Sequence, residues 1–489
     1  MRAPYTGAAI GAIPAGTPGD LDLAVRNAQA EQELWSRRSF SDRARIFLRF
    51  HDLLLARQDE VLDLIQWETG KARRHAMEEI LDTATVTRYY ARRARRLLRP
   101  RRRQGAIPGL TRTREFRHPV GVVGLIVPWN YPLNLAVTDA VPALMAGNAA
   151  VLKPDVQTSF TALWAVDLLR QAGLPRDVFG VVTGEGLLLG PALGERVDYL
   201  MFTGSTATGR LVGRQAAERL IGCSLELGGK NPMIVLADAD LERAVYGAIQ
   251  GCFASSGQAC ISIERIYVHE SIAGRFLDSL VARTHDLKLG ASLDYTMDMG
   301  SLTGERQLRR VEQHVRDAVE KGAVVLAGGR ARPDLGPFFY EPTVLASVTE
   351  EMRVYAEETF GPVVSVYPFA TDAEAVERAN ATRYGLSASI WTRRAGHGAQ
   401  LARQIRAGSV NVNEAYAAAW GSVDAPCGGR KESGLRARHG AEGILKFTEA
   451  QSVAVQRLVP VGTPRGMDAV AHARWMTRLL KLLRRSGWR

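Results

Sequence analysis

Four short apolar runs between Gly121 and Ser205 constrain the fold of this chain more than any other feature. They read GVVGLIVPW, AAVLKP, VFGVVTG and YLMFTGS, and each ends at or beside Gly, Pro or Ser. Helical segments separate them, and strands that alternate with helices form a parallel sheet with helices on both faces. Such strands are buried on both faces, which explains the continuous apolar runs. The sequence therefore predicts a doubly wound α/β domain.

A second alternating region follows Cys260, with the runs RIYVH, AVVLAG, VVSVYPF and ASIWT. Residues from Asp20 to about Gln104 have helical spacing instead. The stretch TRTREFRHP, residues 111–119, alternates like a strand, and SVAVQ, residues 452–456, is a late isolated strand. We expect two α/β regions with a crevice between them, an arrangement that suits an enzyme that binds a nucleotide.

Composition and cysteine usage narrow the class of protein. With 46% apolar and 23% charged residues over 489 positions, the chain is typical of a soluble protein of two or three domains. The N-terminal GAAIGAIPAG is broken by Gly and Pro and makes a poor secretory signal. The four cysteines form no C-x-x-C pair and no zinc spacing. We therefore expect a cytoplasmic protein with reduced thiols and no metal.

The positive charge is concentrated in two segments. The net charge is +12, and residues 92–103 hold eight arginines while residues 474–489 hold six cations and no acid, so the rest of the chain is near neutral. A protein that binds nucleic acid would spread its cations along a groove and add aromatic residues for stacking. We expect a solvated or subunit-facing surface and no nucleic-acid partner.

Three residues in separate motifs bring reactive groups. Cys260 stands in SSGQACIS, a small-residue stretch typical of a turn or helix start. Glu226 lies in SLELGGKNP, where a carboxylate is costly unless it is partnered or functional, and burial would make it a base near neutral pH. Asn130, in PWNYP, ends the first strand with an amide donor. A thiol, a carboxylate base and an amide donor together suit acyl chemistry on a carbonyl group.

The turn FTGSTATG, residues 202–209, follows the fourth strand. Its glycines permit close approach of the backbone, and Ser205 is placed to meet a phosphate at a helix N-terminus. Neither the G-x-G-x-x-G nor the P-loop spacing is present, so the turn alone is equally compatible with a plain strand-to-helix connection.

The motifs PWNYP, LKP, FTGSTATG, ELGGKNP, GQAC, EETFGPV and GGRKESG together give the chain a clear family resemblance. From about Asp20 to Leu458 it resembles the non-acylating, NAD(P)-dependent aldehyde dehydrogenases, in which these motifs occur in the same order. The resemblance implies that Cys260 attacks an aldehyde to form a thiohemiacetal and then a thioester. Its oxygen would be held by the Asn130 amide and the Cys260 N–H, and Glu226 would activate the hydrolytic water.

The resemblance also implies how a cofactor is bound. It places Lys153 and Glu358 at the two riboses, Phe360 beside the nicotinamide, Gly204 and Ser205 at the pyrophosphate, and Trp129 in the cleft. Members that require NAD commonly have a glutamate three residues after the lysine of LKP, but KPDVQT has Val156 there. We therefore expect that NADP or NAD is accepted, with a slight preference for NADP, and that no metal takes part.

The family architecture implied is an α/β fold of two doubly wound parallel-sheet domains and a β-arm. The cofactor domain is expected at residues 1–100, 120–227 and 424–447, the catalytic domain at 228–423, and the oligomerisation arm at 101–119 and 448–458. The arm would extend the sheet of a neighbouring subunit, as an edge strand can. A homodimer or a dimer of dimers is therefore expected.

Residues 459–489 form a basic tail that contains HARWMTRLLKLLRRSGWR. On a helix, one side would carry Trp475, Met476, Leu479, Leu480 and Leu483, and the other Arg474, Arg478, Lys481 and Arg485. Such a helix can dock on its own or a neighbouring subunit, make weak contact with an anionic membrane surface, or remain disordered.

Further stretches bear on the substrate. GQACISIERIYV, YTMDMGSL, FFYEPTVL and NVNEAYAAAWGS are similar to a second bacterial branch of succinate-semialdehyde dehydrogenases. The better-known branch has two carboxylate-binding arginines, at positions that here are Thr138 and Ala254. Tyr131 and Tyr416 are alternative donors in the pocket. Succinate semialdehyde is the first expectation, and a broad range of aliphatic or aromatic aldehydes is the alternative.

Two other classes of protein remain possible from the sequence. In a CoA-acylating dehydrogenase a thiol takes the acyl group, but that branch lacks the base, and Glu226 is present here. A non-catalytic binding protein on the same fold would not need Cys260, Glu226 and Asn130 together. Both classes are therefore less favoured than the hydrolytic aldehyde dehydrogenase.

Overall fold

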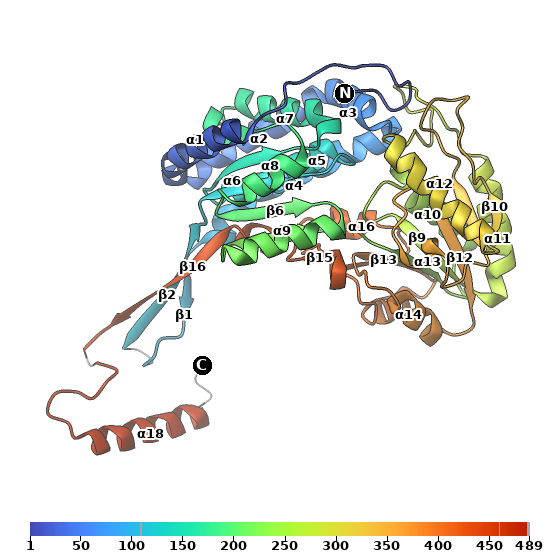
Figure 1. Cartoon of the computed structure of the whole chain (residues 1–489). Coiled ribbons are helices and arrows are strands. Elements are labelled where there is room, and N and C mark those ends of the chain that lie inside the picture. Colours follow the sequence, from blue (N-terminus) through green and yellow to red (C-terminus); the bar gives the residue numbers. More distant parts are fainter. Residues whose placement is uncertain (108–109, 459, 487–489) are drawn as a thin grey trace.

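The computed structural model describes residues 1–107, 110–458 and 460–486. Figure 1 shows two large sheets covered by helices, a narrow arm that projects from the first of them, and a separate C-terminal helix beyond the arm. The tail positions 459 and 487–489 lie outside the described residues.

The chain begins with four helices whose ends follow from local capping. They are α1 (Pro18–Arg37), α2 (Phe40–Ala56), α3 (Gln58–Thr69) and α4 (Arg73–Leu98). Thr17 and Asp20 form a capping box at the start of α1, and Gly70 ends α3 with φ 77°. The helical stretch ends at Leu98, so the expectation that it continues to about Gln104 is wrong. Pro100 interrupts it, and the arginines after it pair as a strand.

The first sheet has six strands in the order β15-β7-β6-β3-β4-β5, and only β15 is antiparallel to its neighbour. The four apolar runs of the sequence form β3 (Val122–Ile126), β4 (Ala149–Lys153), β5 (Phe179–Val181) and β6 (Tyr199–Thr203). The periodicity did not reveal β7 (Gly222–Glu226) or the two-residue β15 (Gly434–Leu435). The helices of this region are α5 (Pro132–Val137), α6 (Ala140–Met145), α7 (Ser159–Gln171), α8 (Gly186–Gly194), α9 (Thr206–Glu218) and α17 (Glu442–Leu445).

The second sheet has seven strands in the order β10-β11-β12-β9-β8-β13-β14, and only β10 is antiparallel. Its strands are β8 (Asn231–Val235), β9 (Ile263–His269), β10 (Val324–Ala327), β11 (Thr343–Ala346), β12 (Val363–Phe369), β13 (Ser387–Trp391) and β14 (Ser409–Val412). Its helices are α10 (Leu241–Phe253), α11 (Glu270–His285), α12 (Glu305–Glu320), α13 (Arg353–Ala356), α14 (Asp372–Asn380), α15 (Ala395–Ala402) and α16 (Ala417–Gly421). The predicted class, α/β with two parallel sheets, is confirmed.

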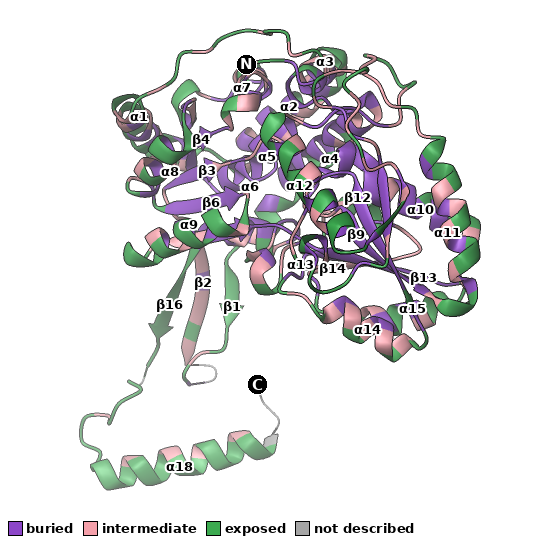
Figure 2. Ribbon diagram, turned by 45° about the vertical axis from the view of Figure 1, so that its right-hand side comes forward, coloured by how far each residue is buried: buried purple, intermediate pink, exposed green. Residues whose placement is uncertain are grey.

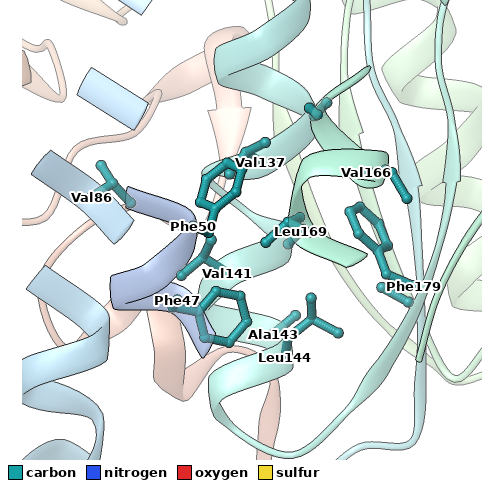
Figure 3. Packing of buried hydrophobic residues seen from close by; sticks show 14 of the residues in the cluster. Phe47, Phe50, Val86, Val137, Val141, Ala143, Leu144, Val166, Leu169 and Phe179 are labelled. Atoms are coloured by element: carbon teal, nitrogen blue, oxygen red, sulfur yellow. The ribbon is translucent and has the colours of Figure 1, made fainter. Parts of the chain in front are cut away.

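A continuous apolar core fixes the helices on the first sheet. Phe47 and Phe50 of α2 are fully buried and pack against α5 and α6, as Figure 3 shows with Val137 and Val141. Phe179 belongs to the same cluster, so the edge strand β5 also packs against this core. Burial of one such side chain stabilises the fold by about 2 kcal/mol. This packing makes the sheet a rigid base for the loops at the carboxyl ends of its strands.

The arm is a three-stranded antiparallel sheet in the order β1-β2-β16. Its strands are β1 (Arg101–Arg103), β2 (Thr111–Pro119) and β16 (Thr448–Gln456). In β16, Thr448 is buried and every following residue is exposed, and Figure 2 shows the arm standing clear of both large sheets. The outer strands β1 and β16 therefore leave edges that are open in the single chain.

Candidate active site

A cavity of about 590 Å³ lies where loops from the two sheets meet. Its wall includes the loops after β3, β6 and β7, which is the usual place for a ligand in an open α/β sheet. Ten of the residues expected from the sequence line it: Trp129, Asn130, Tyr131, Gly204, Ser205, Glu226, Cys260, Glu358, Phe360 and Tyr416. A larger cavity of about 710 Å³ lies at the root of the arm, but no cysteine lines it, so the smaller cavity is the candidate site.

The loop that carries Cys260 has an unusual backbone. After α10 ends, Ser255, Ser256 and Gly257 follow with φ of 52°, 57° and 68°, all in the left-handed region. A Cβ atom on Gly257 would lie 2.1 Å from the carbonyl oxygen of Gly361, so only glycine fits there. Backbone strain of this kind costs about 1–3 kcal/mol per residue and is concentrated at functional sites.

Two buried asparagines hold this loop in place. The side-chain amide of Asn231 donates to the carbonyl oxygens of Cys260 at 2.8 Å and Ser262 at 2.7 Å. The amide of Asn130 donates to the Gln258 carbonyl at 3.0 Å. Because an amide nitrogen carries two hydrogens, Asn130 keeps one N–H for a further acceptor in the cavity. Asn231 was not singled out from the sequence, although it lies in the GGKNP motif.

Glu226 ends β7 as a buried carboxylate, and its Oε1 atom has no hydrogen-bond partner. Burial raises its pKa from 4.5 to about 7, and the positive charges of Arg438 and Lys446 oppose that rise. The direction is the one expected from the sequence, since desolvation disfavours the charged form. Burial also raises the pKa of the Cys260 thiol, to about 12, so the resting nucleophile is protonated.

Arg438 is the main residue of the site that the sequence did not reveal. It lines the cavity, is 4% exposed, and forms an ion pair with Asp139 at 3.0 Å. It also donates to Thr203 Oγ1 at 2.5 Å, and Lys446 reaches the same aspartate at 2.9 Å. The two cations hold the pKa of the Asp139 carboxyl below its usual range despite burial. This cluster places positive charge beside Glu226 and Cys260.

The cofactor end of the cavity is built from rings and glycines. Trp129 and Phe360 meet edge to face with their ring centroids 5.6 Å apart. Glu358 accepts a hydrogen bond from the Gly229 N–H at 2.8 Å, and burial raises its pKa to about 7. A Cβ on Gly228 would lie 2.3 Å from the Glu358 carboxylate, so a side chain there would displace that carboxylate.

The turn after β6 suits a phosphate group. Ser205 is the N-cap of α9, and its hydroxyl accepts the Thr208 N–H at 3.3 Å. Gly204 and Ser205 line the cavity, and the N–H groups of a helix's first turn have no partner within the helix, so this helix end favours an anion. Lys153 ends β4 on the same sheet edge but lies outside the residues that line the cavity. These donors fit a dinucleotide that extends from the cavity along the edge of the sheet.

A model described as the aldehyde dehydrogenase family matches residues 1–453. The chain belongs to the aldehyde dehydrogenase family. A relative from Mycolicibacterium smegmatis, provisionally named a succinate-semialdehyde dehydrogenase [NADP(+)], is 50% identical over 98% of this chain and 93% of its own. This aldehyde dehydrogenase is therefore an oxidoreductase that acts on aldehydes.

Solved structures agree with this assignment. An NADP-dependent enzyme of E. coli superposes with a TM-score of 0.90 at 34% identity, covering 93% of this chain and 94% of its own. An aldehyde dehydrogenase of Bacillus cereus in complex with NAD+ has a TM-score of 0.89 at 35% identity, covering 93% of this chain and 92% of its own.

Two expected pocket residues of this aldehyde dehydrogenase are not on the cavity wall. Thr138 directly follows α5, donates its N–H to the Asn134 carbonyl at 2.8 Å, and is buried. Ala254 directly follows α10 and is also buried. At the positions of the two arginines in the better-known branch, this chain therefore has two buried, uncharged residues that do not line the cavity.

The tyrosines that do line the cavity are already hydrogen-bonded. Tyr131 and Tyr416 both donate their hydroxyls to the carboxylate of Glu78 on α4, at 3.2 and 3.1 Å. Burial raises the pKa of Glu78, which was not identified from the sequence. Asp82 and Glu414 line the same cavity. The cavity wall around the two tyrosines is therefore aromatic and acidic, and Lys71, the cation beside the Tyr131 ring, is already paired with Glu79.

Proposed function

We propose that Cys260 is the nucleophile and Glu226 the base in an NAD(P)+-dependent oxidation of an aldehyde to a carboxylic acid. One observation carries the assignment: a buried carboxylate with a pKa of about 7 shares a cavity wall with the cysteine. A pKa near the working pH is what a general base requires. The paired cation Arg438 does not neutralise Glu226, because its ion pair is with Asp139.

Cys260 Sγ attacks the carbonyl carbon and forms a thiohemiacetal. The thiol proton leaves to solvent, so Glu226 stays ionised for the later step; the charges of Glu226 and Glu358 both act on Cys260. The free Asn130 N–H and the Cys260 N–H donate to the developing oxyanion. Bound NAD(P)+ supplies the hydride acceptor. Glu226 then removes a proton from the water that attacks the thioester carbon, and Cys260 leaves as the carboxylic acid forms.

We assign the cofactor to the cleft with Lys153 and Glu358 at the riboses and Gly204 and Ser205 at the pyrophosphate. NADP is accepted with a slight preference over NAD. Val156 is 41% exposed, just past the end of β4, and brings no negative charge that would repel a 2′-phosphate. The name of the M. smegmatis relative includes NADP(+), which supports the same choice.

Succinate semialdehyde is the first candidate substrate, and the names of relatives about 50% identical support it. The second candidate is an uncharged aliphatic or aromatic aldehyde, which the acidic and aromatic wall around Glu78 favours. A carboxylate in that part of the cavity would lack a free cation and would be strongly disfavoured.

Comparing kcat/KM for succinate semialdehyde and butanal separates these candidates, since the two differ mainly in the carboxylate. Dedicated recognition favours the acid by at least about tenfold, or about 1.4 kcal/mol. A ratio near one selects the uncharged class.

The catalytic assignment is tested with Cys260→Ala in the full-length protein. The variant is expected to form no reduced cofactor from any aldehyde, because no other cysteine shares the cavity wall. Cys252→Ala is the matched control, since Cys252 is buried on α10 and outside that wall. Normal turnover by Cys260→Ala would end the proposal.

The arm is proposed to join subunits as a homodimer or a dimer of dimers in the cytoplasm. The open edges of β1 and β16 support this, because an unpaired edge is a template for another strand. Light scattering on the full chain measures the mass. A monomer at micromolar concentration would contradict it.

A further inference from the structure

The C-terminal tail forms a helix that stands apart from its own subunit. α18 (Ala469–Ser486) begins where the Ala471 N–H donates to Asp468, at 3.0 Å. Figures 1 and 2 both place α18 beyond the tip of the arm, away from the two large sheets. None of its residues with a described side chain is buried. Docking on its own subunit, one of the expectations from the sequence, is therefore not what the structure has.

The helix has two chemically distinct faces. Arg474, Arg478, Lys481 and Arg485 follow one another at spacings of four, three and four residues, so they share one side. Trp475, Met476, Leu479 and Leu480 lie on the opposite side. Trp475 is 48% exposed and Leu480 62% exposed, which leaves large apolar surfaces in water. Residues 469–486 contain no acid.

The tip of the arm adds cations at the same end of the molecule. Arg102 of β1 lies directly opposite Arg114 of β2. Arg112 and Arg457 are exposed nearby, and the pKa of Arg112 is lowered because Arg114, Arg102 and Arg457 repel its charge. Like charges opposite each other on a sheet are destabilising. An external anion that binds this end would relieve the repulsion.

We propose that α18 binds the surface of an anionic lipid bilayer and that the arginines of the arm tip support it. The apolar side enters the boundary between headgroups and acyl chains, and the cations meet lipid phosphates.

The helix is about 27 Å long, and in this proposal it lies along the membrane surface. Among the residues described, no helix is long and apolar enough to cross a bilayer. A second copy of the chain is a less suitable occupant, because outside residues 92–103 and 474–489 it is near neutral and offers no excess of negative charge to the basic side of α18.

The experiment is co-sedimentation of the full-length protein with vesicles of phosphatidylcholine alone or with about one quarter phosphatidylglycerol. The full chain is compared with a chain truncated after Val461 and with Leu479→Gln/Leu480→Gln. Glutamine keeps helix propensity while it removes the apolar surface. Thr477→Gln is the matched control, because it changes neither the charge nor the large apolar side chains.

The full chain and Thr477→Gln should pellet with anionic vesicles at least about fivefold more than the truncated chain or the double variant. Raising the salt concentration to about 0.5 M should weaken binding, because the Debye length shortens. Equal pelleting of the full and truncated chains overturns the proposal, whether or not truncation changes the oligomer mass. Equal pelleting of the double variant and the full chain overturns it too. Aldehyde turnover, at a cavity remote from α18, reports that every variant is folded.

Discussion

Replacing Glu226 with Gln should stabilise the protein at alkaline pH while it removes the proposed base. The Glu226 pKa is raised by burial from 4.5 to about 7, so the folded state binds this proton more tightly than the unfolded state. The free energy of unfolding therefore falls as pH rises between these two pKa values, and the whole loss is present above pH 7. The shift corresponds to about 3 kcal/mol. Glutamine has nearly the same shape and no charge to desolvate.

Urea unfolding of wild type and Glu226→Gln at pH 5 and pH 8 measures this loss of unfolding free energy. The variant should gain up to about 3 kcal/mol at pH 8 and much less at pH 5, where wild-type Glu226 is mostly protonated. Glu242→Gln is the control, because its carboxylate is exposed on α10 and should show no such difference. A gain as large at pH 5 as at pH 8, or a loss at pH 8, would refute the reasoning.

The same substitution separates the two halves of catalysis. Glu226→Gln should release one equivalent of reduced cofactor in a burst and then stall at the thioester. Wild-type hydrolysis should rise about tenfold from pH 6 to pH 8, because a base with a pKa of about 7 goes from about one tenth to nine tenths ionised. Rapid mixing followed by steady-state measurement tests both points. Unimpaired turnover of the variant would remove Glu226 from the mechanism.

The other predictions concern the surroundings of the site. Arg438→Gln should move the pH profile of kcat/KM upward, because Arg438 lowers the pKa of both Glu226 and Cys260; an unchanged profile would show that the arginine is only structural. Gly257→Ala should lower both stability and turnover, since its Cβ would meet the Gly361 oxygen at 2.1 Å in a left-handed backbone; a normal urea midpoint would contradict this. NAD should not be preferred over NADP by more than about a hundredfold in kcat/KM, or about 2.7 kcal/mol, because Val156 brings no repelling carboxylate.

Local sequence patterns determined much of the fold. The apolar runs that became β3, β4 and β6 are almost wholly buried, so their character does not depend on which neighbour they pair with. TRTREFRHP matches β2 at both ends, since alternation alone defines a strand with two different faces. Cys260, Glu226 and Asn130 were identified because their motifs combine reactive groups with glycine and proline at close spacing.

Burial, which decides what a charged side chain does, came only from the tertiary structure. Arg438 and Arg436 are two residues apart in LRARHG and look alike in the sequence, yet Arg438 is 4% exposed while Arg436 is exposed. In the sequence, Glu78 is one of several charged residues on a helix. Only the structure shows that Tyr131 and Tyr416, which are distant in sequence, donate hydrogen bonds to it. Whether α18 lies on the protein or away from it was equally undetermined. In each case the energy of a charge or an apolar face depends on what surrounds it in space, and the chain order does not contain that information.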